Sequence, residues 1–437
     1  VSENRRRSGR QAHGGHGAFC GFGGSGRASL AGSPRRLRHH HHAQNIARPT
    51  VFLSVSPGQL QGDAALQYAL LAHYGITCLV TDEATQALPQ ALSHSHGVID
   101  ALFGVGLSRP LTGIYASWVE RLNASSKQYG LPVIAVDVPS GLCAKTAQVH
   151  GLAVMATHTV TLGMSKPGLY LQHGKLYSGK VFVAPIGIPN ACIQSTAADA
   201  YLLTSQWAQA TWPIRSPVSH KGSCGTVLVI AGSAAMPGAA CLTAMAALRS
   251  GAGRVVVAAP TVALRDMALP PEIIRQPLGL DCSAALTPGA MSSLLPWLSQ
   301  ATALAVGPGL TTQPQVDESL KTLLQQLTQH YPALPVVWDA DALTLASQWP
   351  KPCTLGQHAI ITPHPGEAAR LLGCSVTQVT QNLLAAAQAL QQQYNAVVVL
   401  KAAGTVIAQA QYCCIMGSFL QSFGYVYFRA ESCRNHI

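Results

Sequence analysis

The stretch Ile361–Thr362–Pro363–His364–Pro365–Gly366–Glu367 joins an apolar run to a helical pattern. Residues 358–361 predict a short buried strand, and residues 367–372 predict the start of a helix. Pro365 suits the first helical turn, because its missing N–H would have no partner there. His364 therefore lies beside free backbone N–H groups that attract anions. Ligands of α/β sheets bind at such strand-to-helix junctions, although a capped turn with a solvated histidine gives the same pattern.

The chain of 437 residues is long enough for two domains with full cores. Hydrophobic residues make up 48% and charged residues only 10%, which suits buried parallel sheets. No run of about 18 apolar residues occurs, so we expect neither a membrane span nor a secretory signal. The twelve cysteines contain no C-x-x-C pair. We therefore expect a cytoplasmic protein without a zinc cluster or a disulfide framework.

The net charge of +11 is concentrated near the N-terminus. Residues 1–48 contain nine arginines against one acid, Glu3, which leaves only +3 for the rest of the chain. This segment is also rich in glycine and histidine and has almost no periodic apolar pattern. We predict a disordered basic segment over residues 1–48 and no nucleic-acid-binding surface.

After this segment, apolar strands alternate with helical patterns. In the first half we predict strands at 50–55, 77–81, 98–103, 132–138, 158–162 and 180–184, and helices at 62–74, 83–92 and 112–126. In the second half we predict strands at 226–231, 254–259, 303–306, 335–338, 358–361 and 396–400, and helices at 238–249, 315–330 and 376–394. Such alternation predicts two βαβ arrays with parallel sheets, at residues 49–190 and 218–410. The Pro-, Ser-, Thr- and Ala-rich residues 191–217 are predicted to be a linker.

Two carboxylates in the first array occupy unusual places. Asp100 lies within an apolar strand, and Asp137 closes another. A carboxylate at the end of a buried strand is unfavourable unless it is paired, binds a metal, takes part in catalysis or caps the following loop. Gly104–Val105–Gly106 would let the backbone approach a phosphate closely, although a single G-x-G is weak evidence.

In the second array, four apolar strands are each followed by a chemically useful residue. Since the carboxyl ends of parallel strands share one edge, we expect one crevice to be lined by Gly309, Asp339, His364 and Lys401. Lys401 and Gly404 suit phosphate binding through a charge and exposed N–H groups. Asp339 or Asp341 could hold Mg²⁺, although Asp341 could equally cap a helix. These residues predict a nucleotide-using phosphotransfer site.

Several motifs resemble those of a known family. His220–Gly222, Ala231–Ser233, Gly307–Leu310, Asp339–Leu343 and Thr362–Glu367 occur in the order of the ADP-dependent NAD(P)H-hydrate dehydratase domain, which has a ribokinase-like fold. Asp100–Gly104 and Asp137–Leu142 resemble the Rossmann-like NAD(P)H-hydrate epimerase domain that is usually fused ahead of it. The resemblance covers residues 50–409 and includes many motifs in order.

The resemblance implies a bifunctional enzyme of metabolite repair. The epimerase, an isomerase, interconverts the R and S forms of hydrated NADH or NADPH. The dehydratase, a lyase, uses ADP to phosphorylate the hydroxyl group that hydration introduced, and loss of this phosphate restores the nicotinamide. The expected partners are therefore small molecules, with no nucleic acid or membrane, and a homo-oligomer is left open.

The resemblance also implies roles for individual residues. Asp100 and Ser140 would hold K⁺, and Asp137 would transfer a proton in the epimerase. The hydrated dinucleotide would be bound by Gly104, Val105, Gly106, Leu107, Ser108, Arg109, Pro110, Asp137, Ala239, Gly309 and His364. The phosphates of ADP, the phosphoryl donor, would be held by Lys401, Ala402, Ala403, Gly404 and Thr405, and Mg²⁺ is expected as a further cofactor. The family usually has glycine at Ala402, so backbone approach there is expected to be slightly hindered.

Both ends depart from the family pattern. Residues 1–48 lack the Asn- and Gly-rich phosphate loop of the epimerase, and residues 411–437 lack the Gly-Gly-x-Gly-Asp segment that supplies the catalytic base of the dehydratase. We expect that reading-frame shifts or truncation produced these ends and that residues 411–437 form a tail unlike the family. Loss of a catalytic group weakens transition-state stabilisation by several kcal/mol, so low dehydratase activity is expected. Two alternatives remain open: a small-molecule kinase of the ribokinase type, and a non-catalytic nucleotide-binding remnant.

Overall fold

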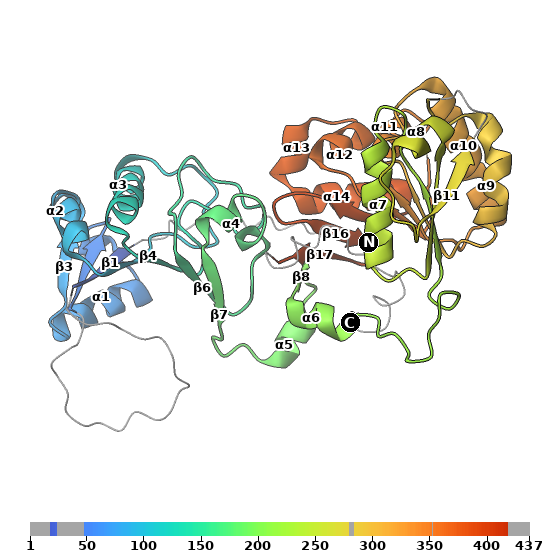
Figure 1. Ribbon diagram of the computed structural model, residues 1–437. Coiled ribbons are helices and arrows are strands. Elements are labelled where there is room, and N and C mark those ends of the chain that lie inside the picture. The colour runs from blue at the N-terminus through green and yellow to red at the C-terminus, as the bar shows by residue number, and fades with distance from the viewer. Residues whose placement is uncertain (1–17, 24–47, 279–283, 352, 418–437) are drawn as a thin grey trace, which may run out of the picture. The chain divides into compact units, whose positions relative to one another are not determined.

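The computed structural model describes residues 18–23, 48–278, 284–351 and 353–417. The chain divides into two compact units, residues 1–197 and 198–437, and each unit is built on its own β-sheet (Figure 1). None of the described helices is long and apolar enough to cross a membrane.

The first unit contains a seven-stranded sheet in the order β3-β2-β1-β4-β5-β6-β7. Its strands are β1 Ala18–Gly23, β2 Arg48–Leu53, β3 Thr77–Val80, β4 Gly97–Ala101, β5 Val133–Val136, β6 His158–Leu162 and β7 Lys180–Ala184. Its helices are α1 Asp63–His73, α2 Thr81–His94, α3 Gly113–Tyr129, α4 Gly174–Tyr177 and α5 Asn190–Gln194. Strand β1 is antiparallel to both β2 and β4, and the remaining pairs are parallel.

Alternating side chains of β2 build the core on both faces of this sheet, since successive residues of a strand point to opposite sides. Phe52 packs with α2 and α3 and meets Trp118 edge-on, with 6.5 Å between the ring centroids. Val51 and Leu53 belong to a second cluster that includes side chains of α1. The sheet is therefore covered by helices on both faces, as the βαβ pattern predicts (Figure 1).

The second unit contains a ten-stranded sheet in the order β11-β10-β9-β12-β13-β14-β15-β16-β17-β8. Its strands are β8 Tyr201–Leu203, β9 Thr226–Ile230, β10 Arg254–Pro260, β11 Ile274–Leu278, β12 Ala303–Val306, β13 Val336–Trp338, β14 Ala359–Ile361, β15 Val397–Leu400, β16 Val406–Gln409 and β17 Tyr412–Met416. Strands β9 to β15 are parallel, so their carboxyl ends share one edge, whereas β16 is antiparallel to both β15 and β17.

Helices connect and cover these strands. They are α6 Ser205–Thr211, α7 Pro237–Arg249, α8 Thr261–Asp266, α9 Met291–Leu298, α10 Pro314–His330, α11 Asp341–Ala346, α12 Pro365–Leu372, α13 Val376–Gln381 and α14 Leu383–Tyr394. Helix α7 packs its alanines against β9 and β10. These small side chains allow the close approach of helix and sheet that their sequence suggests.

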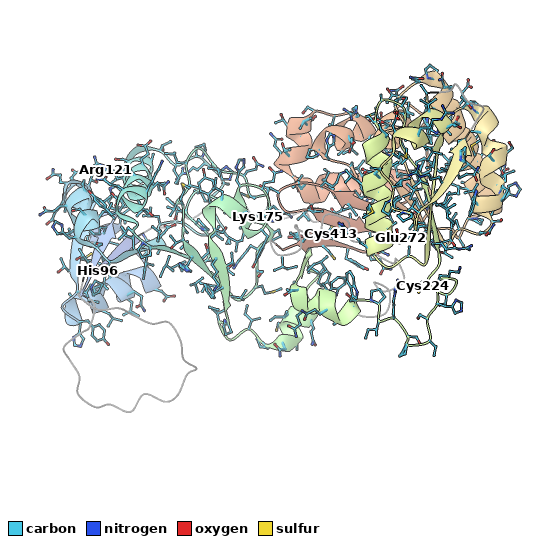
Figure 2. The ribbon with its side chains drawn as sticks, in the orientation of Figure 1. His96, Arg121, Lys175, Cys224, Glu272 and Cys413 are labelled. Atoms are coloured by element: carbon cyan, nitrogen blue, oxygen red, sulfur yellow. The ribbon has the colours of Figure 1, made fainter. Side chains whose placement is uncertain are left out.

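The structure differs at four places from the elements predicted from the sequence. Residues 18–23 lie in the segment predicted to be disordered, yet they form β1, because the strand pairs on both sides with β2 and β4. The segment 191–217, predicted to be a linker, contains parts of regular structure, and its strand β8 joins the second sheet beside β17. Strand β17 in turn lies in the predicted tail, where the buried Cys413 contributes to the core (Figure 2). The rest of residues 1–47 and 418–437 lies outside the described residues.

The fourth correction concerns the helix predicted at 376–394. Two helices, α13 and α14, meet at Asn382, whose φ of −152° is not helical. Its side-chain carbonyl accepts a hydrogen bond from Ala385 N at 3.1 Å and so caps α14. Asparagine favours such a local side-chain bond, which explains why a continuous periodic pattern is divided here.

Candidate functional site

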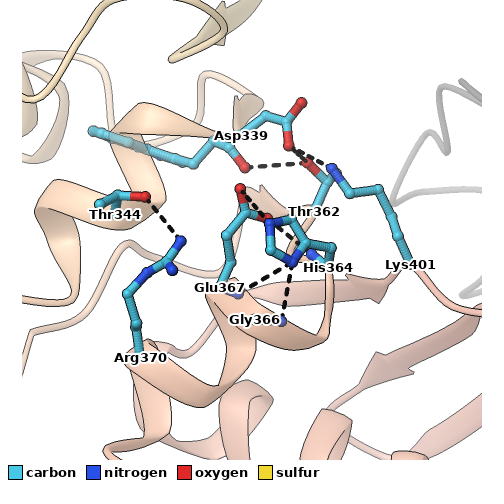
Figure 3. Close-up of polar contacts among 9 residues, drawn as sticks. Asp339, Thr344, Thr362, His364, Gly366, Glu367, Arg370 and Lys401 are labelled. Atoms are coloured by element: carbon cyan, nitrogen blue, oxygen red, sulfur yellow. Dashed lines mark hydrogen bonds and ion pairs between the residues drawn. The ribbon is translucent and has the colours of Figure 1, made fainter. Parts of the chain in front are cut away.

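Three polar side chains meet at the carboxyl edge of the second sheet. Asp339 follows β13, Thr362 follows β14 and Lys401 follows β15. Asp339 Oδ1 accepts hydrogen bonds from Thr362 Oγ1 at 2.7 Å and from Lys401 Nζ at 2.8 Å (Figure 3). The three strands are neighbours in the sheet, which brings together residues that lie 62 positions apart in the chain. We call Asp339, Thr362 and Lys401 the edge cluster.

The edge cluster has the chemistry of a phosphate and metal site. The Lys401 side chain is 41% exposed, so its ammonium group can also reach a ligand. Asp339 is nearly buried, and its Oδ2 makes no hydrogen bond within the part of the chain that the structure describes. A carboxylate oxygen without a partner suits Mg²⁺.

His364 begins the helix beside this cluster. Its Nδ1 accepts hydrogen bonds from Gly366 N at 3.0 Å and Glu367 N at 3.4 Å, while Glu367 Oε2 accepts one from His364 N at 2.8 Å (Figure 3). This reciprocal capping box fixes the ring. In the neutral ring, the proton is therefore on Nε2. Its Nε2 lies 3.5 Å from Glu367 Oε1, and the side chain is 53% exposed, so a ligand can reach the ring.

A tight turn after β12 forms a cradle on the same edge. Gly309 has a φ of +69°, and a Cβ built on it would lie 2.8 Å from the Cβ of Ala239 and 2.9 Å from Met236 O. Ala239 lies in the first turn of α7, which follows β9. The turn also contacts β13, because a Cβ on Gly307 would lie 1.9 Å from Asp339 O. The four residues predicted to share a crevice thus follow neighbouring strands at one edge, in the order Gly309, Asp339, His364 and Lys401.

The loop after Lys401 has the backbone that the sequence suggests. Gly404 is buried with a φ of +90°, a conformation that glycine adopts without strain. Thr405 O accepts a hydrogen bond from Met416 N at 2.9 Å, which attaches the loop to β17. Asp341, the other candidate for Mg²⁺, starts α11, and its Oδ2 accepts a hydrogen bond from Thr311 N at 2.9 Å. The N-cap of α11 is Ala340, without a side-chain cap hydrogen bond, so Asp341 holds the loop after β12 and does not cap its own helix.

In the first unit, Asp100 and Ser140 form a buried pair. The Ser140 hydroxyl donates to Asp100 Oδ1 at 2.6 Å, and Ser140 N donates to Asp100 Oδ2 at 2.8 Å. Burial raises the pKa of Asp100 to about 6, although the hydrogen bonds from Ser140 and Leu102 lower it in part. Phe103 O lies 3.3 Å from the Ser140 hydroxyl, so carboxylate, hydroxyl and carbonyl oxygens come together. Oxygen atoms of this kind suit a hard cation such as K⁺.

Asp137 closes β5 with a φ of +69° and faces a lysine. Its Oδ1 accepts hydrogen bonds from Leu162 N at 3.0 Å and from Lys166 Nζ. Burial opposes ionisation, but the hydrogen bond and charge of Lys166 together with the Leu162 N–H lower the pKa of Asp137 below its ordinary value. The sequence did not predict that Lys166 takes part in this site. Its position shortly after the carboxyl end of β6 was the one signal that could have indicated it.

The loop after β4 lies beside this carboxylate. A Cβ built on Gly104 would lie 4.0 Å from Asp137 Oδ2. The other predicted substrate-binding residues of the loop are exposed except Leu107, which is half-buried. The structure thus brings Gly104 and Asp137 together as the resemblance implies. Among the described residues, no three His, Cys, Asp or Glu side chains group together as a metal site, so a bound cation would rely on the mixed oxygen atoms already named.

Comparisons with known proteins cover both units. The family model of NAD(P)H-hydrate dehydratase matches residues 227–420, and the model of the YjeF-related protein N-terminus matches residues 17–168. The matches include β1 and β17, so likeness to the family extends beyond the predicted residues 50–409 at both ends. The predictions that residues 1–48 and 411–437 are unlike the family are therefore wrong for residues 17–48 and 411–420.

Curated relatives share the two-part organisation. The bifunctional NAD(P)H-hydrate repair enzyme of Moorella thermoacetica is 34% identical over 395 residues, which are 89% of this chain and 72% of the relative. The corresponding enzyme of Coxiella burnetii is 35% identical, over 91% of this chain and 75% of the relative. A solved structure of ADP/ATP-dependent NAD(P)H-hydrate dehydratase from Bacillus subtilis, co-crystallised with ATP/Mg²⁺, is 31% identical and covers 50% of this chain and 73% of that one, with a TM-score of 0.39.

Proposed function

This chain belongs to the family of bifunctional NAD(P)H-hydrate repair enzymes, and we propose that its two units divide the two reactions of that family. Members combine an NAD(P)H-hydrate epimerase, an isomerase, with an NAD(P)H-hydrate dehydratase, a lyase. We assign the epimerase to the sheet of residues 49–190 together with β1. The dehydratase is assigned to the sheet of residues 218–410 together with β8 and β17.

The dehydratase site is proposed at the carboxyl edge of the second sheet. The observation that carries this proposal is the edge cluster, where the Lys401 ammonium group pairs with Asp339, and where the backbone of Asp339 lies against Gly307 in the same turn as Gly309. The cradle of Gly309 and Ala239, with His364, would bind the hydrated nicotinamide. The phosphates of ADP would be bound by Lys401, Ala402, Ala403, Gly404 and Thr405.

In this scheme, the residues of the edge cluster prepare the phosphate site. Asp339 and Thr362 hold Lys401 in place before the nucleotide binds, so its ammonium group is already oriented toward the edge. Lys401 then exchanges its carboxylate partner for phosphate oxygens, which frees Asp339. Mg²⁺, when bound by Asp339, would neutralise phosphate charge.

The epimerase site is proposed around Asp137. Lys166 keeps this carboxylate ionised, so Asp137 can accept a proton from the hydrate at neutral pH. Gly104, Val105, Gly106, Leu107, Ser108, Arg109 and Pro110 would bind the dinucleotide beside it. K⁺ at Asp100 and Ser140 would compensate a buried carboxylate next to this loop.

We propose the cytoplasm as the location of the protein. Cys353 and Cys413 are free thiols outside any disulfide, which suits this reducing compartment.

We further propose that the 437-residue chain binds ADP more readily than it turns over the hydrate. This proposal rests on the residues that follow the Lys401 loop, because residues 411–437 contain neither an aspartate nor a Gly-Gly-x-Gly-Asp motif. The absence of a catalytic group slows a reaction by about 10²–10⁴-fold.

The test is a repair assay with purified chain and an epimer mixture of hydrated NADH, followed by chromatography of the R and S forms and by NADH absorbance. We expect equilibration of the two forms without ADP, and slow, ADP-dependent recovery of NADH that Lys401→Met abolishes. Asp137→Asn should stop equilibration of the two forms and leave the ADP-dependent recovery of NADH in place. Phosphorylation of a sugar or vitamin precursor without any action on the hydrate would support a small-molecule kinase instead. Ligand-induced thermal stabilisation without turnover of either epimer would support a nucleotide-binding remnant.

A further inference from the structure

A cleft of the second unit lies at the edge of the sheet opposite to the edge cluster. It has a volume of about 330 Å³ and is lined by Arg215, Ser216, Ser219, His220, Lys221, Cys224, Ala252 and Gly253. These residues precede β9 and β10, whereas the edge cluster follows the carboxyl ends of neighbouring strands. A strand of five residues such as β9 is about 16 Å long, so the two regions are separate. Cys224 marks this cleft in Figure 2.

The cleft is rich in positive charge and hydrogen-bond donors. Its lining includes a guanidinium group, an ammonium group, an imidazole and two serine hydroxyls, but no carboxylate. Within the described ranges, neither Arg215 nor Lys221 forms an ion pair. Two cations held near each other without an acidic partner create a field that attracts anions.

Close backbone contacts hold these donors in place. The Arg215 guanidinium donates to Gly251 O, and a Cβ on Gly251 would lie 3.1 Å from Arg215 Nη2. A Cβ on Gly253 would lie 1.9 Å from Lys221 O, so the loop that carries Lys221 rests directly on this glycine. A larger residue at either glycine would collide with the wall of the cleft.

His220 is also oriented by its own loop. Its Nδ1 accepts hydrogen bonds from Gly222 N at 3.2 Å and Ser223 N at 3.4 Å. The neutral ring therefore carries its proton on Nε2, which makes His220 a donor at the cleft. Ser223 Oγ accepts a hydrogen bond from His220 N at 2.9 Å and secures the same turn.

We propose that this cleft binds the phosphate group of a small soluble ligand, a phosphomonoester or a diphosphate, at a place separate from the proposed dehydratase site. A guanidinium fork, a mobile ammonium group and neutral N–H and O–H donors together match the several acceptor oxygens of phosphate. This phosphate site gives a role to the motif His220–Lys221–Gly222, which neither proposed reaction uses. It does not depend on the hydrate-repair chemistry.

The test measures binding of inorganic phosphate to the full chain by ³¹P relaxation, at constant ionic strength. All proteins carry Lys401→Met, so that the proposed nucleotide site does not contribute. We expect measurable phosphate binding, which Lys221→Gln and, separately, Arg215→Gln weaken about tenfold through loss of one charge-assisted contact. Lys321→Gln is the matched control, because Lys321 is an exposed lysine paired with Asp317 on α10.

Three results would overturn the proposal. They are no phosphate binding in the Lys401→Met background, equal weakening by Lys321→Gln, and unchanged binding in both cleft variants. Circular dichroism of each variant checks that the fold is retained, and the two cleft substitutions provide independent tests. Loss of ADP binding by Lys401→Met is measured separately, so a failure of the proposed dehydratase site would leave this result interpretable.

Discussion

Gly309→Ala should both destabilise the second unit and close the proposed hydrate cradle. Alanine at a φ of +69° is disfavoured by roughly 1–2 kcal/mol. Its Cβ would also lie 2.8 Å from the Cβ of Ala239 and 2.9 Å from Met236 O, both far inside normal contact distance. Such overpacking typically adds about 1–3 kcal/mol. The free energy of unfolding should therefore fall by about 2–5 kcal/mol in total.

Gly373→Ala separates the two effects. Gly373 caps α12 with a φ of +67°, and nothing lies within 4 Å of a Cβ built there. The two variants share the backbone strain, so their difference in urea denaturation reports the collision alone. Hydrogen exchange of peptides from the second unit assigns the loss to that unit. Equal destabilisation of the two variants would refute the tight cradle. Unchanged affinity of Gly309→Ala for hydrated NADH would refute its assignment to the substrate.

Further predictions concern both units. Asp339→Asn should tighten binding of Mg²⁺-free ADP about fivefold, because Asp339 competes with phosphate for Lys401. The ion pair is worth about 1 kcal/mol at this partly exposed site. Isothermal titration measures the change in ADP affinity. Lys166→Met should raise the pKa of Asp137 by removing its hydrogen bond and charge, and so move the acidic limb of the pH profile of epimerisation to higher pH. For Asp100, the folded pKa of about 6 exceeds the ordinary value of 3.8, so its contribution to stability is complete below 3.8 and is lost as pH rises through about 6. The loss amounts to ~3 kcal/mol, measured by urea denaturation of the first unit in potassium-free buffer.

Matched variants accompany these measurements. Asp341→Asn removes a nearby carboxylate that does not contact Lys401, and it should leave ADP affinity unchanged. An equal gain in both aspartate variants would show a general charge effect in place of competition. Lys180→Met removes an exposed lysine of β7 and should not move the epimerase profile. A first unit whose stability is flat between pH 3.8 and about 6 would contradict the argument for Asp100.

The alternation of strands and helices could be predicted because each element carries its own pattern. The predicted strands 158–162 and 180–184 match β6 and β7 residue for residue. Strand β1 could not be found this way, since its six residues lie among Arg-, His- and Gly-rich sequence and depend on distant partners on both sides. The break at Asn382 was missed because one capping side chain interrupts a pattern that otherwise continues.

The alignment of the four candidate residues at one edge of the second sheet could be predicted, because parallel strands align their carboxyl ends. The pairing of Asp339 with Lys401 could not, since it depends on the order of strands that are far apart in the sequence. Thr362 belongs to the motif Thr362–Glu367, yet its hydrogen bond to Asp339 depends on the pairing of β13 with β14 in the folded sheet. Lys166 reaches back 29 residues to Asp137, a separation that no local pattern reports.

The most direct test of the central claim is isothermal titration of ADP into the wild-type chain and into Lys401→Met, with Lys321→Met as the control for loss of a lysine. If the carboxyl edge of the second sheet holds the nucleotide, Lys401→Met should bind ADP about tenfold more weakly or worse, while Lys321→Met should match the wild type. Equal ADP affinity in all three proteins would contradict the assignment.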